Sequence, residues 1–146
     1  MRIKVSTTID APVGAVWDYV ENISSHVEWM ADAETIEFTS ARHAGVGTEF
    51  ICVTKVGPFR VRDAMQVTEW TARRAMGIRH EGIVTGDGVF TLHKRRGNRT
   101  RFTWKERLSF PLWMGGSVGA LCAKPILRMI WKRNLRRLKA HCESGR

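Results

Sequence analysis

The sequence has little of what disulfide-rich, membrane-spanning or metal-binding chains contain. Only three cysteines, Cys52, Cys122 and Cys142, occur among its 146 residues, and no Cys-x-x-Cys motif is present. This argues against a disulfide scaffold or a zinc site and favours a reducing, cytoplasmic environment. The N-terminus alternates polar and apolar residues, whereas a signal peptide needs an unbroken apolar run, so secretion is disfavoured. The most apolar stretch, 113–131, contains Lys124, Pro125 and Arg128 and therefore does not predict a transmembrane helix.

Acidic residues are also scarce. The chain has 14 acidic and 24 basic residues, which gives a formal net charge of +10. The excess lies in segments 94–107, with seven basic residues, and 124–146, with eight, each holding one acidic residue. Three interpretations stay open: plain solvation of the surface, attraction to an anionic membrane through residues 124–146, or nucleic-acid binding. The third is disfavoured, because no nucleic-acid motif is present and strand alternation turns the aromatic rings of 94–107 inward.

The remaining composition, 43% hydrophobic and 26% charged, is typical of one packed domain, which we expect to span residues 1–146. Alternation predicts a first strand over 3–9, and Asp10-Ala11-Pro12 predicts the start of a short helix, followed by another short helix carrying Trp29. Six more strands are predicted, at Thr35–Ser40, Thr48–Val56, Phe59–Trp70, Ala75–Gly82, Gly88–Arg95 and Thr100–Phe110. Turn residues separate them, at Gly45-Val46-Gly47, Gly57-Pro58, Thr71–Arg74, Thr85-Gly86-Asp87 and Gly97-Asn98, which predicts an antiparallel meander.

The last third of the chain predicts one long amphipathic helix. Leu127, Trp131, Leu135 and Leu138 follow one another at helical spacing up to about Cys142, and Pro125 is expected to kink the helix or mark its start. A seven-stranded antiparallel sheet needs a cover on one face, which this helix can supply. The predicted fold is therefore α+β: a curved sheet, two short helices and one long C-terminal helix.

Several motifs occur in a characteristic order along the chain. They are Asp10-Ala11-Pro12 with Val16-Trp17, then Trp29, Gly45-x-Gly47-Thr48, Val67-Thr68-Glu69-Trp70, Thr100-Arg101-Phe102-Thr103-Trp104, and 134–139 with Glu143. Together they resemble the SRPBCC superfamily, the START-like helix-grip proteins that include polyketide cyclases, plant allergen-like ligand binders and lipid carriers. The resemblance covers nearly the whole chain. It implies a helix-grip fold with a cavity between sheet and C-terminal helix for a hydrophobic molecule, but no shared catalytic residues.

Strand alternation predicts which side chains face that cavity. Phe59, Val61, Met65 and Val67 share one face of their strand with Asp63, whereas Trp70 falls on the opposite parity and is expected outside or at a strand end. Alternation in all the strands, together with one residue of the long helix, predicts these ligand-binding residues: Phe50, Cys52, Asp63, Met65, Ile78, His80, Phe90, Leu92, Trp104, Glu106 and Leu121.

Three of these residues, Asp63, His80 and Glu106, are ionisable. The register expected from the turns pairs His80 with Phe90 and Phe90 with Glu106. This leaves His80 two strands from Glu106, roughly 10 Å away between backbones. The three side chains have three possible roles: orienting a polar group of the ligand, acid–base chemistry by His80 and Glu106 in an aldol cyclisation or dehydration, or solvated positions near strand ends.

The expected function is binding of a small hydrophobic molecule, such as a polyketide, an isoprenoid, a fatty acyl chain or a quinone. A polyketide cyclase or dehydratase using His80 and Glu106 is the alternative, and a basic interaction module at an anionic membrane or a partner is a third. The sequence predicts no cofactor and no metal site, because its five histidines are scattered and the glycines at 115–119 lack the GxGxxG pattern. It does not determine the ligand or the oligomeric state.

Overall fold

Seven antiparallel strands form a single curved sheet. The computed structural model, which describes residues 1–56 and 58–144, orders them β1-β7-β6-β5-β4-β3-β2. The strands are β1 (Arg2–Ile9), β2 (Ala33–Phe38), β3 (Glu49–Val56), β4 (Phe59–Thr71), β5 (Ala75–Glu81), β6 (Thr85–Arg95) and β7 (Arg99–Ser109). Strands β2 to β7 pair in sequence order, and β1 joins the free edge of β7. The meander and the seven strands predicted from the sequence are thus confirmed.

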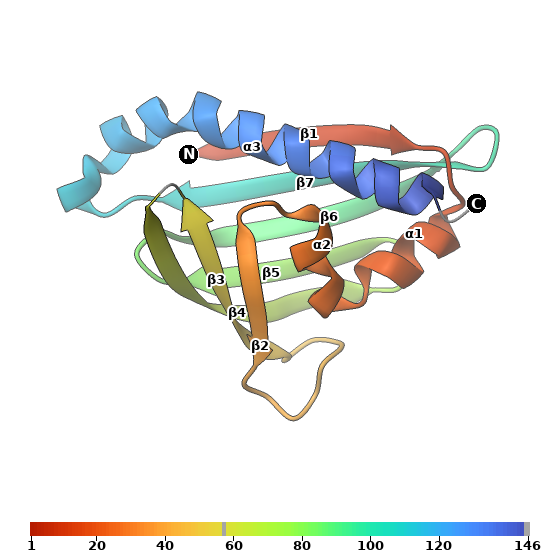
Figure 1. Ribbon diagram of the computed structural model, residues 1–146, viewed down its shortest axis with the longest axis horizontal. Helices are drawn as coiled ribbons and strands as arrows, with labels where there is room; N and C mark the ends of the chain where they lie inside the picture. Colours follow the sequence, from red (N-terminus) through yellow and green to blue (C-terminus); the bar gives the residue numbers. More distant parts are fainter. Residues whose placement is uncertain (57, 145–146) are drawn as a thin grey trace.

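Five helical segments accompany the sheet (Figure 1). They are α1 (Val13–Val20), the 3₁₀ turn η1 (Ile23–Ser25), α2 (His26–Trp29), the 3₁₀ turn η2 (Leu112–Met114) and α3 (Gly116–Ser144). Helix α3 arches over the sheet and packs mainly against β1. Pro125 lies inside α3, so it does not mark the start of the helix. Its ring removes one backbone donor, and its side chain is exposed on the outer surface of the helix.

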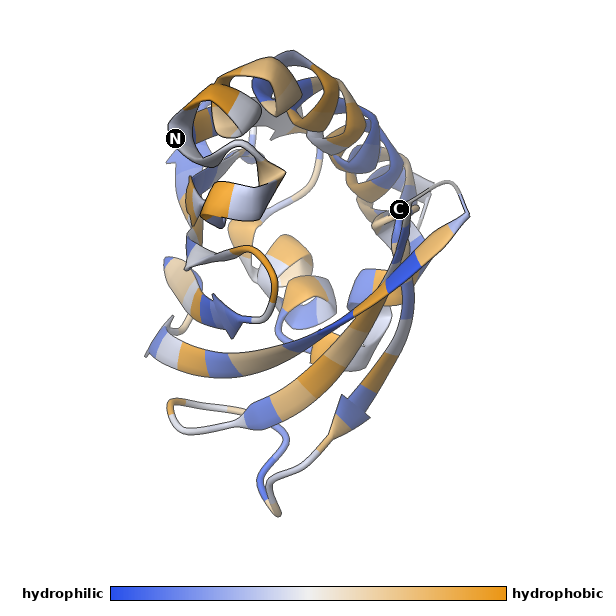
Figure 2. Cartoon of the chain, turned by 90° about the vertical axis from the view of Figure 1, so that its left-hand side faces the viewer, coloured by the Kyte–Doolittle hydropathy of each residue, from blue (hydrophilic) through white to orange (hydrophobic). Residues whose placement is uncertain are grey.

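The hydrophobic core fills the end of the molecule near α1 and α2. Trp29 is fully buried, and its ring lies 5.7 Å from that of Phe90, 6.2 Å from Phe102 and 5.9 Å from Trp104. Leu135 and Leu138 of α3 are buried in the same core. Figure 2, which looks along the molecule from its other end, shows the strands curling round beneath the arch of α3. The first part of α3 therefore has less core beneath it than the last part.

Two strand registers differ from those expected. Strand β6 begins at Thr85, because the chain turns at 82–84 and not at Thr85–Asp87. As a result His80 pairs with Gly86 and not with Phe90. On the other side of β6, Phe90 pairs with Trp104 and Gly88 pairs with Glu106, so the predicted Phe90–Glu106 pair is wrong. A hairpin register depends on the turn, and a turn misplaced by a few residues shifts the pairing of the whole strand.

Trp70 lies one residue from the end of β4, as one of the two expectations had it, but an irregularity in the strand turns its side chain toward the core. The pairing with β5 shifts between Val67 and Glu69, so that Trp70 pairs with Met76 and the alternation reverses. Trp70 is half-buried, and its ring meets that of Trp17 edge-on at 5.4 Å. Simple parity fails at this point because one extra residue in the strand moves every later side chain to the other face.

Among the residues that the structure describes, no helix is both long and apolar enough to span a membrane. Gly57 of the predicted Gly57-Pro58 turn and residues 145–146 of the predicted basic segment lie outside the described residues.

Candidate functional site

A cavity of about 640 Å³ opens between the concave face of the sheet and α3. Strands β2 to β7 form its floor, and α2, the chain leading into β2, η2 and α3 complete its walls. Nine of the eleven predicted ligand-binding residues line it: Phe50, Cys52, Asp63, Met65, Ile78, His80, Phe90, Trp104 and Glu106. Most of these are apolar, and the three ionisable side chains lie on the same surface. Strand alternation therefore placed these nine side chains on the correct face.

Two predicted residues do not line the cavity. Leu92 follows Phe90 on the inward face of β6, but it lies farther along the strand, where it pairs with Phe102 inside the filled core. Leu121 is 70% exposed on α3, whereas the neighbouring Ala120 is buried, so Leu121 lies on the outward side of the helix. Alternation identifies the inward face of an element, but it does not tell where along that element the core ends and the cavity begins.

The cavity also contains residues that strand alternation does not assign. From α2 and the following chain come His26, Met30 and Asp32, and from α3 come Leu127 and Trp131. Hydrophobic residues from loops and from η2 surround the rest: Ile83, Val84, Phe110, Trp113 and Met114. Phe59, which alternation had placed on the inward face of β4, lines the cavity beside them. The helical spacing of Leu127 and Trp131 indicates burial. For His26 and Asp32, no sequence pattern distinguishes a cavity wall from a loop.

His80 and Glu106 are in direct contact. The Nε2 of His80 donates a hydrogen bond to Oε2 of Glu106 at 2.9 Å, and Nε1 of Trp104 donates to the other carboxylate oxygen, also at 2.9 Å. The two residues lie on β5 and β7, with β6 between them. They meet because β6 has glycine at its inward positions 86 and 88. A Cβ on Gly88 would overlap the Glu106 carboxylate, so the contact requires glycine there. The separation of roughly 10 Å expected from the sequence applies to backbones and not to these side-chain atoms.

Asp63 lies close to this pair and has a less satisfied environment. Its Oδ1 is buried and has no hydrogen-bond partner among the described residues. A Cβ on Gly82, in the turn between β5 and β6, would overlap this oxygen, so here too glycine leaves room for a carboxylate. A buried acceptor without a partner is costly, typically about 1–3 kcal/mol.

Burial and charge shift the pKa values of this cluster. Burial raises the pKa of Asp63 above its usual range, against a smaller opposing effect of His80. For His80, burial opposes the charged form, but the hydrogen bond and the charge of Glu106, with smaller contributions from Asp63 and Asp87, raise the pKa overall. His80 is therefore charged over a wider pH range than a free imidazole, and Asp63 holds its proton to a higher pH than a free carboxyl group.

Two other ionisable groups that line the cavity, His26 and Cys52, are uncharged near neutral pH and are therefore poor candidates for acid–base or nucleophilic catalysis. His26 is completely buried, its Nε2 donates to the backbone carbonyl of Val20 at 2.9 Å, and burial lowers its pKa to about 4. Burial also raises the pKa of the Cys52 thiol to about 11, so little thiolate forms near neutral pH. Within the described part of the chain, no group of three or more His, Cys, Asp or Glu side chains is placed to hold a metal ion.

These features define a helix-grip protein with an apolar internal cavity and one polar cluster on its wall. The model of the family "Polyketide cyclase / dehydrase and lipid transport" matches residues 1–143, and the chain belongs to this family. A search of curated proteins finds no sequence match.

Solved structures show the same fold at low sequence identity. A protein of Thermus thermophilus has a TM-score of 0.82 at 15% identity, with 99% of both chains covered. A conserved protein of Geobacillus kaustophilus has a TM-score of 0.81 at 12% identity, covering 99% of this chain and 97% of that one. The Zhui aromatase/cyclase of a Streptomyces species has a TM-score of 0.75 at 16% identity, covering 98% of this chain and 93% of that one. At such identities the likeness is one of fold.

Proposed function

We propose that the protein binds a small, mostly apolar molecule in the cavity and holds its polar group at Asp63, His80 and Glu106. The observation that carries this proposal is the cavity of about 640 Å³, which has mostly apolar walls and gathers these three side chains on one side. Its volume lies within the range of roughly 300–1,000 Å³ typical of small-molecule sites. A polyketide, an isoprenoid, a fatty acyl chain or a quinone-like molecule fits this description, and the family description names lipid transport as well as cyclisation.

The polar cluster restricts the ligand further. Asp63 lines the cavity and has one oxygen without a hydrogen-bond partner among the described residues, whereas both oxygens of Glu106 already accept hydrogen bonds. We therefore expect a ligand with a hydroxyl or similar donor near one end and an apolar body that covers Phe50, Ile78 and Phe90. The apolar body supplies most of the affinity, and the donor fixes the orientation.

Two probe molecules test the two parts of this proposal, the apolar walls and the polar contact. Naphthalene reports on the apolar walls alone, and 1-naphthol adds one hydroxyl group; both can be titrated into ¹⁵N-labelled protein and followed by amide chemical shifts. We expect saturable shifts at cavity residues, and affinity for 1-naphthol about 3- to 10-fold higher, as one net hydrogen bond of roughly 1 kcal/mol implies. Asp63→Asn should reduce the preference for 1-naphthol and leave naphthalene affinity unchanged.

Glu37→Gln is the matched control, because it makes the same carboxyl-to-amide change at an exposed position of β2. It should bind both probes as the wild type does. Shifts scattered over the outer surface, or no saturable shifts, would contradict the proposal that the cavity binds apolar ligands. Equal affinities for the two probes in the wild type would contradict the role of Asp63. Mass spectrometry of protein purified from its own host would then identify the natural ligand.

The contact between His80 and Glu106 favours a second candidate, a dehydratase or aldol cyclase. In a dehydration, a base removes a proton from the carbon next to a carbonyl, and an acid protonates the hydroxyl group that leaves as water; no oxidant or reductant is needed. Glu106 would orient the imidazole of His80 and stabilise its charged form, which leaves Nδ1 to exchange a proton with the substrate. The raised pKa of Asp63 favours a protonated carboxyl group that can act as the acid.

The β-hydroxy ketone 4-hydroxy-4-phenylbutan-2-one tests this candidate, because loss of water gives a conjugated enone with a strong ultraviolet absorbance. An enzyme would form the enone faster than buffer does, and His80→Ala would abolish the acceleration while Glu37→Gln would keep it. A binding protein would return the ketone unchanged.

A further inference from the structure

Large apolar side chains are exposed on η2 and the first half of α3. Leu112 is 92% and Trp113 75% exposed, and Val118, Leu121, Ile126 and Met129 of α3 each expose more than half of their surface. Figure 2 views the molecule from the end at which these segments lie and shows hydrophobic residues over the first turns of α3. Soluble monomers rarely expose apolar side chains in such a group, and a contiguous apolar patch marks a contact surface.

The second half of the same helix is different. Most of its exposed residues are polar, and Lys132, Arg133, Arg136 and Arg137 on the outside are cationic. Solvation alone predicts polar residues along the whole outer surface of α3. The change from apolar to cationic side chains therefore singles out the first half of α3, together with η2, as a surface that is covered by something less polar than water.

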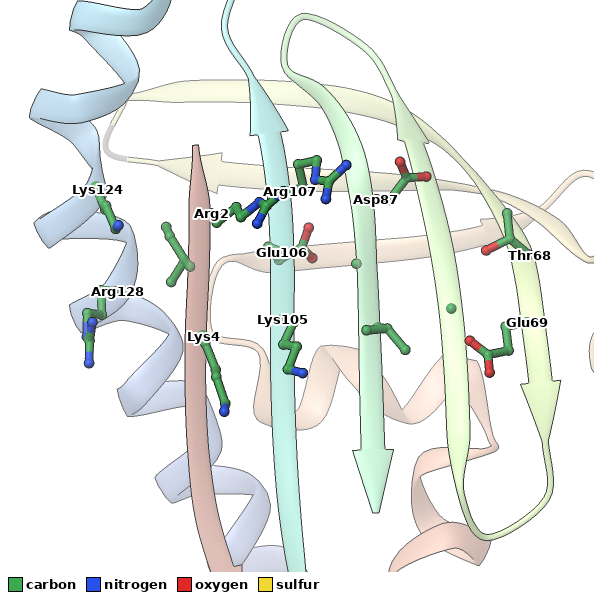
Figure 3. Close-up of a pocket in the computed structure, with 14 residues that line it drawn as sticks. Arg2, Lys4, Thr68, Glu69, Asp87, Lys105, Glu106, Arg107, Lys124 and Arg128 are labelled. Carbon is green, nitrogen blue, oxygen red and sulfur yellow. The ribbon is translucent and has the colours of Figure 1, made fainter. Parts of the chain in front are cut away.

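A basic groove adjoins this apolar surface. It has a volume of about 860 Å³ and lies between α3 and the outer face of β1, β7 and β6 (Figure 3). Six cationic side chains gather there, from β1, β7 and α3: Arg2, Lys4, Lys105, Arg107, Lys124 and Arg128. None of the six forms an ion pair or a side-chain hydrogen bond with a described residue. Three acidic side chains line the groove as well: Asp87, which already pairs with Arg79, Glu106, and Glu69 of β4.

We propose that η2, the first half of α3 and the basic groove form a docking surface for an anionic membrane. The apolar side chains would enter the interfacial region of the bilayer, and the six cations would contact anionic head groups. Charge decides between this occupant and a second copy of the chain, because two molecules of net charge +10 repel each other. The surface lies mainly before residue 130 and on β1 and β7, and so differs from the segment 124–146 expected from the sequence.

The docking surface borders the cavity, because the two share side chains. Trp113 and Met114 of η2 and Leu127 of α3 line the cavity as well. An apolar molecule leaving the bilayer next to these side chains would reach the cavity without crossing bulk water. The docking proposal goes beyond ligand binding, and vesicle binding is measured without any ligand, so either proposal can fail alone.

Sedimentation with lipid vesicles tests the proposal. We expect the full chain to bind vesicles of phosphatidylcholine with 30 mol% phosphatidylserine at about 0.15 M salt, and to bind pure phosphatidylcholine vesicles at least tenfold more weakly. Lys124→Gln with Arg128→Gln should weaken binding to the anionic vesicles about 30-fold, since each basic residue near the surface contributes about 1 kcal/mol. Leu112→Ser with Leu121→Ser should weaken it as well, without any change of charge.

Arg133→Gln with Arg136→Gln is the control, because it removes the same charge from exposed positions in the second half of α3. It should change vesicle binding less than about threefold, and circular dichroism should show all three double variants folded. Equal losses in this control and in the Lys124/Arg128 variant would overturn the proposal, because a general charge effect would explain both. Equal binding to the two vesicle types, or no binding to either, would also overturn it. A dimer that forms with rising concentration in the wild type but not in the Leu112/Leu121 variant would overturn it as well.

Discussion

Replacing Gly88 by alanine is the sharpest test of how the polar cluster of the cavity is built. The new Cβ would overlap the carboxylate of Glu106, which must then move away from His80, from Trp104, or from both. A hydrogen bond to a charged group is worth about 1.5–3 kcal/mol, and alanine recovers about 0.5–1 kcal/mol over glycine in a strand. We therefore expect Gly88→Ala to lower the free energy of unfolding by about 1–2 kcal/mol, or the melting temperature by roughly 2–8 °C.

The same substitution should change the titration of His80. Glu106 raises the pKa of His80 in the folded protein, against burial, so loss of the contact should lower that pKa below its wild-type value. A raised folded pKa stabilises the protein fully below the unfolded value of about 6.5, and this stabilisation is lost as the pH rises through the folded pKa. The part of the stability difference due to His80 should therefore be largest below about pH 6.5 and shrink above it.

Nuclear magnetic resonance titration of the histidine rings, assigned with His80→Gln, measures the pKa, and urea unfolding measures the stability. Gly14→Ala is the control, because a Cβ there meets only ordinary contacts with Arg73 at 3.7 Å. It lies in α1, where alanine should be neutral or stabilising by up to about 1 kcal/mol. If Gly88→Ala keeps both the wild-type stability and the wild-type pKa of His80, the explanation of the contact by an open glycine position is refuted.

Two further predictions concern stability. Burial lowers the pKa of His26 to about 4, so the stability that its neutral form gives is present above about pH 6.5 and is lost as the pH falls toward 4, by up to about 3 kcal/mol. Urea unfolding at several pH values should show this loss of stability. His26→Phe should remove the pH dependence, whereas His93→Gln, at an exposed position, should keep it. Asn134 is fully buried in α3, where its amide accepts a hydrogen bond from the backbone N–H of Ala31 and donates one to Asp32, both at 3.0 Å. Asn134→Ala should therefore lower the free energy of unfolding by about 2–3 kcal/mol in the same assay. The control Arg133→Gln, at the neighbouring exposed position, should change it by less than about 0.5 kcal/mol.

The Asn134 contacts also show how the helix and the sheet are joined. They tie α3 to the chain between α2 and β2, and Asp32 is itself part of the cavity wall. A buried amide that satisfies two polar groups fixes one arrangement of α3 over the sheet, which apolar packing alone specifies less sharply. The same helix therefore closes the core at one end through Leu135 and Leu138 and borders the cavity at the other through Leu127.

Local sequence patterns predicted the elements and most of their inward faces. Alternation with period two is a local property, since successive side chains of a strand point to opposite sides whatever the strand pairs with. Turn residues are local as well, because they depend on the backbone angles of a few positions. These two signals were sufficient for seven strands, their antiparallel order and nine side chains of the cavity, including Asp63, His80 and Glu106. The long helix followed from a third local signal, the helical spacing of its apolar residues.

The contacts between those side chains depend on how the strands and the helix pack together. Whether His80 reaches Glu106 depends on the register across β6, which a shift of the turn to 82–84 changed, and on the absence of a side chain at Gly88 between them. The reversal at Trp70, the end of the core at Leu92 and the exposure of Leu121 likewise depend on neighbours distant in sequence. A face is set by the strand's own geometry, whereas a contact is set by the positions of two or three strands at once, and those positions are fixed only when the whole sheet packs against its helix.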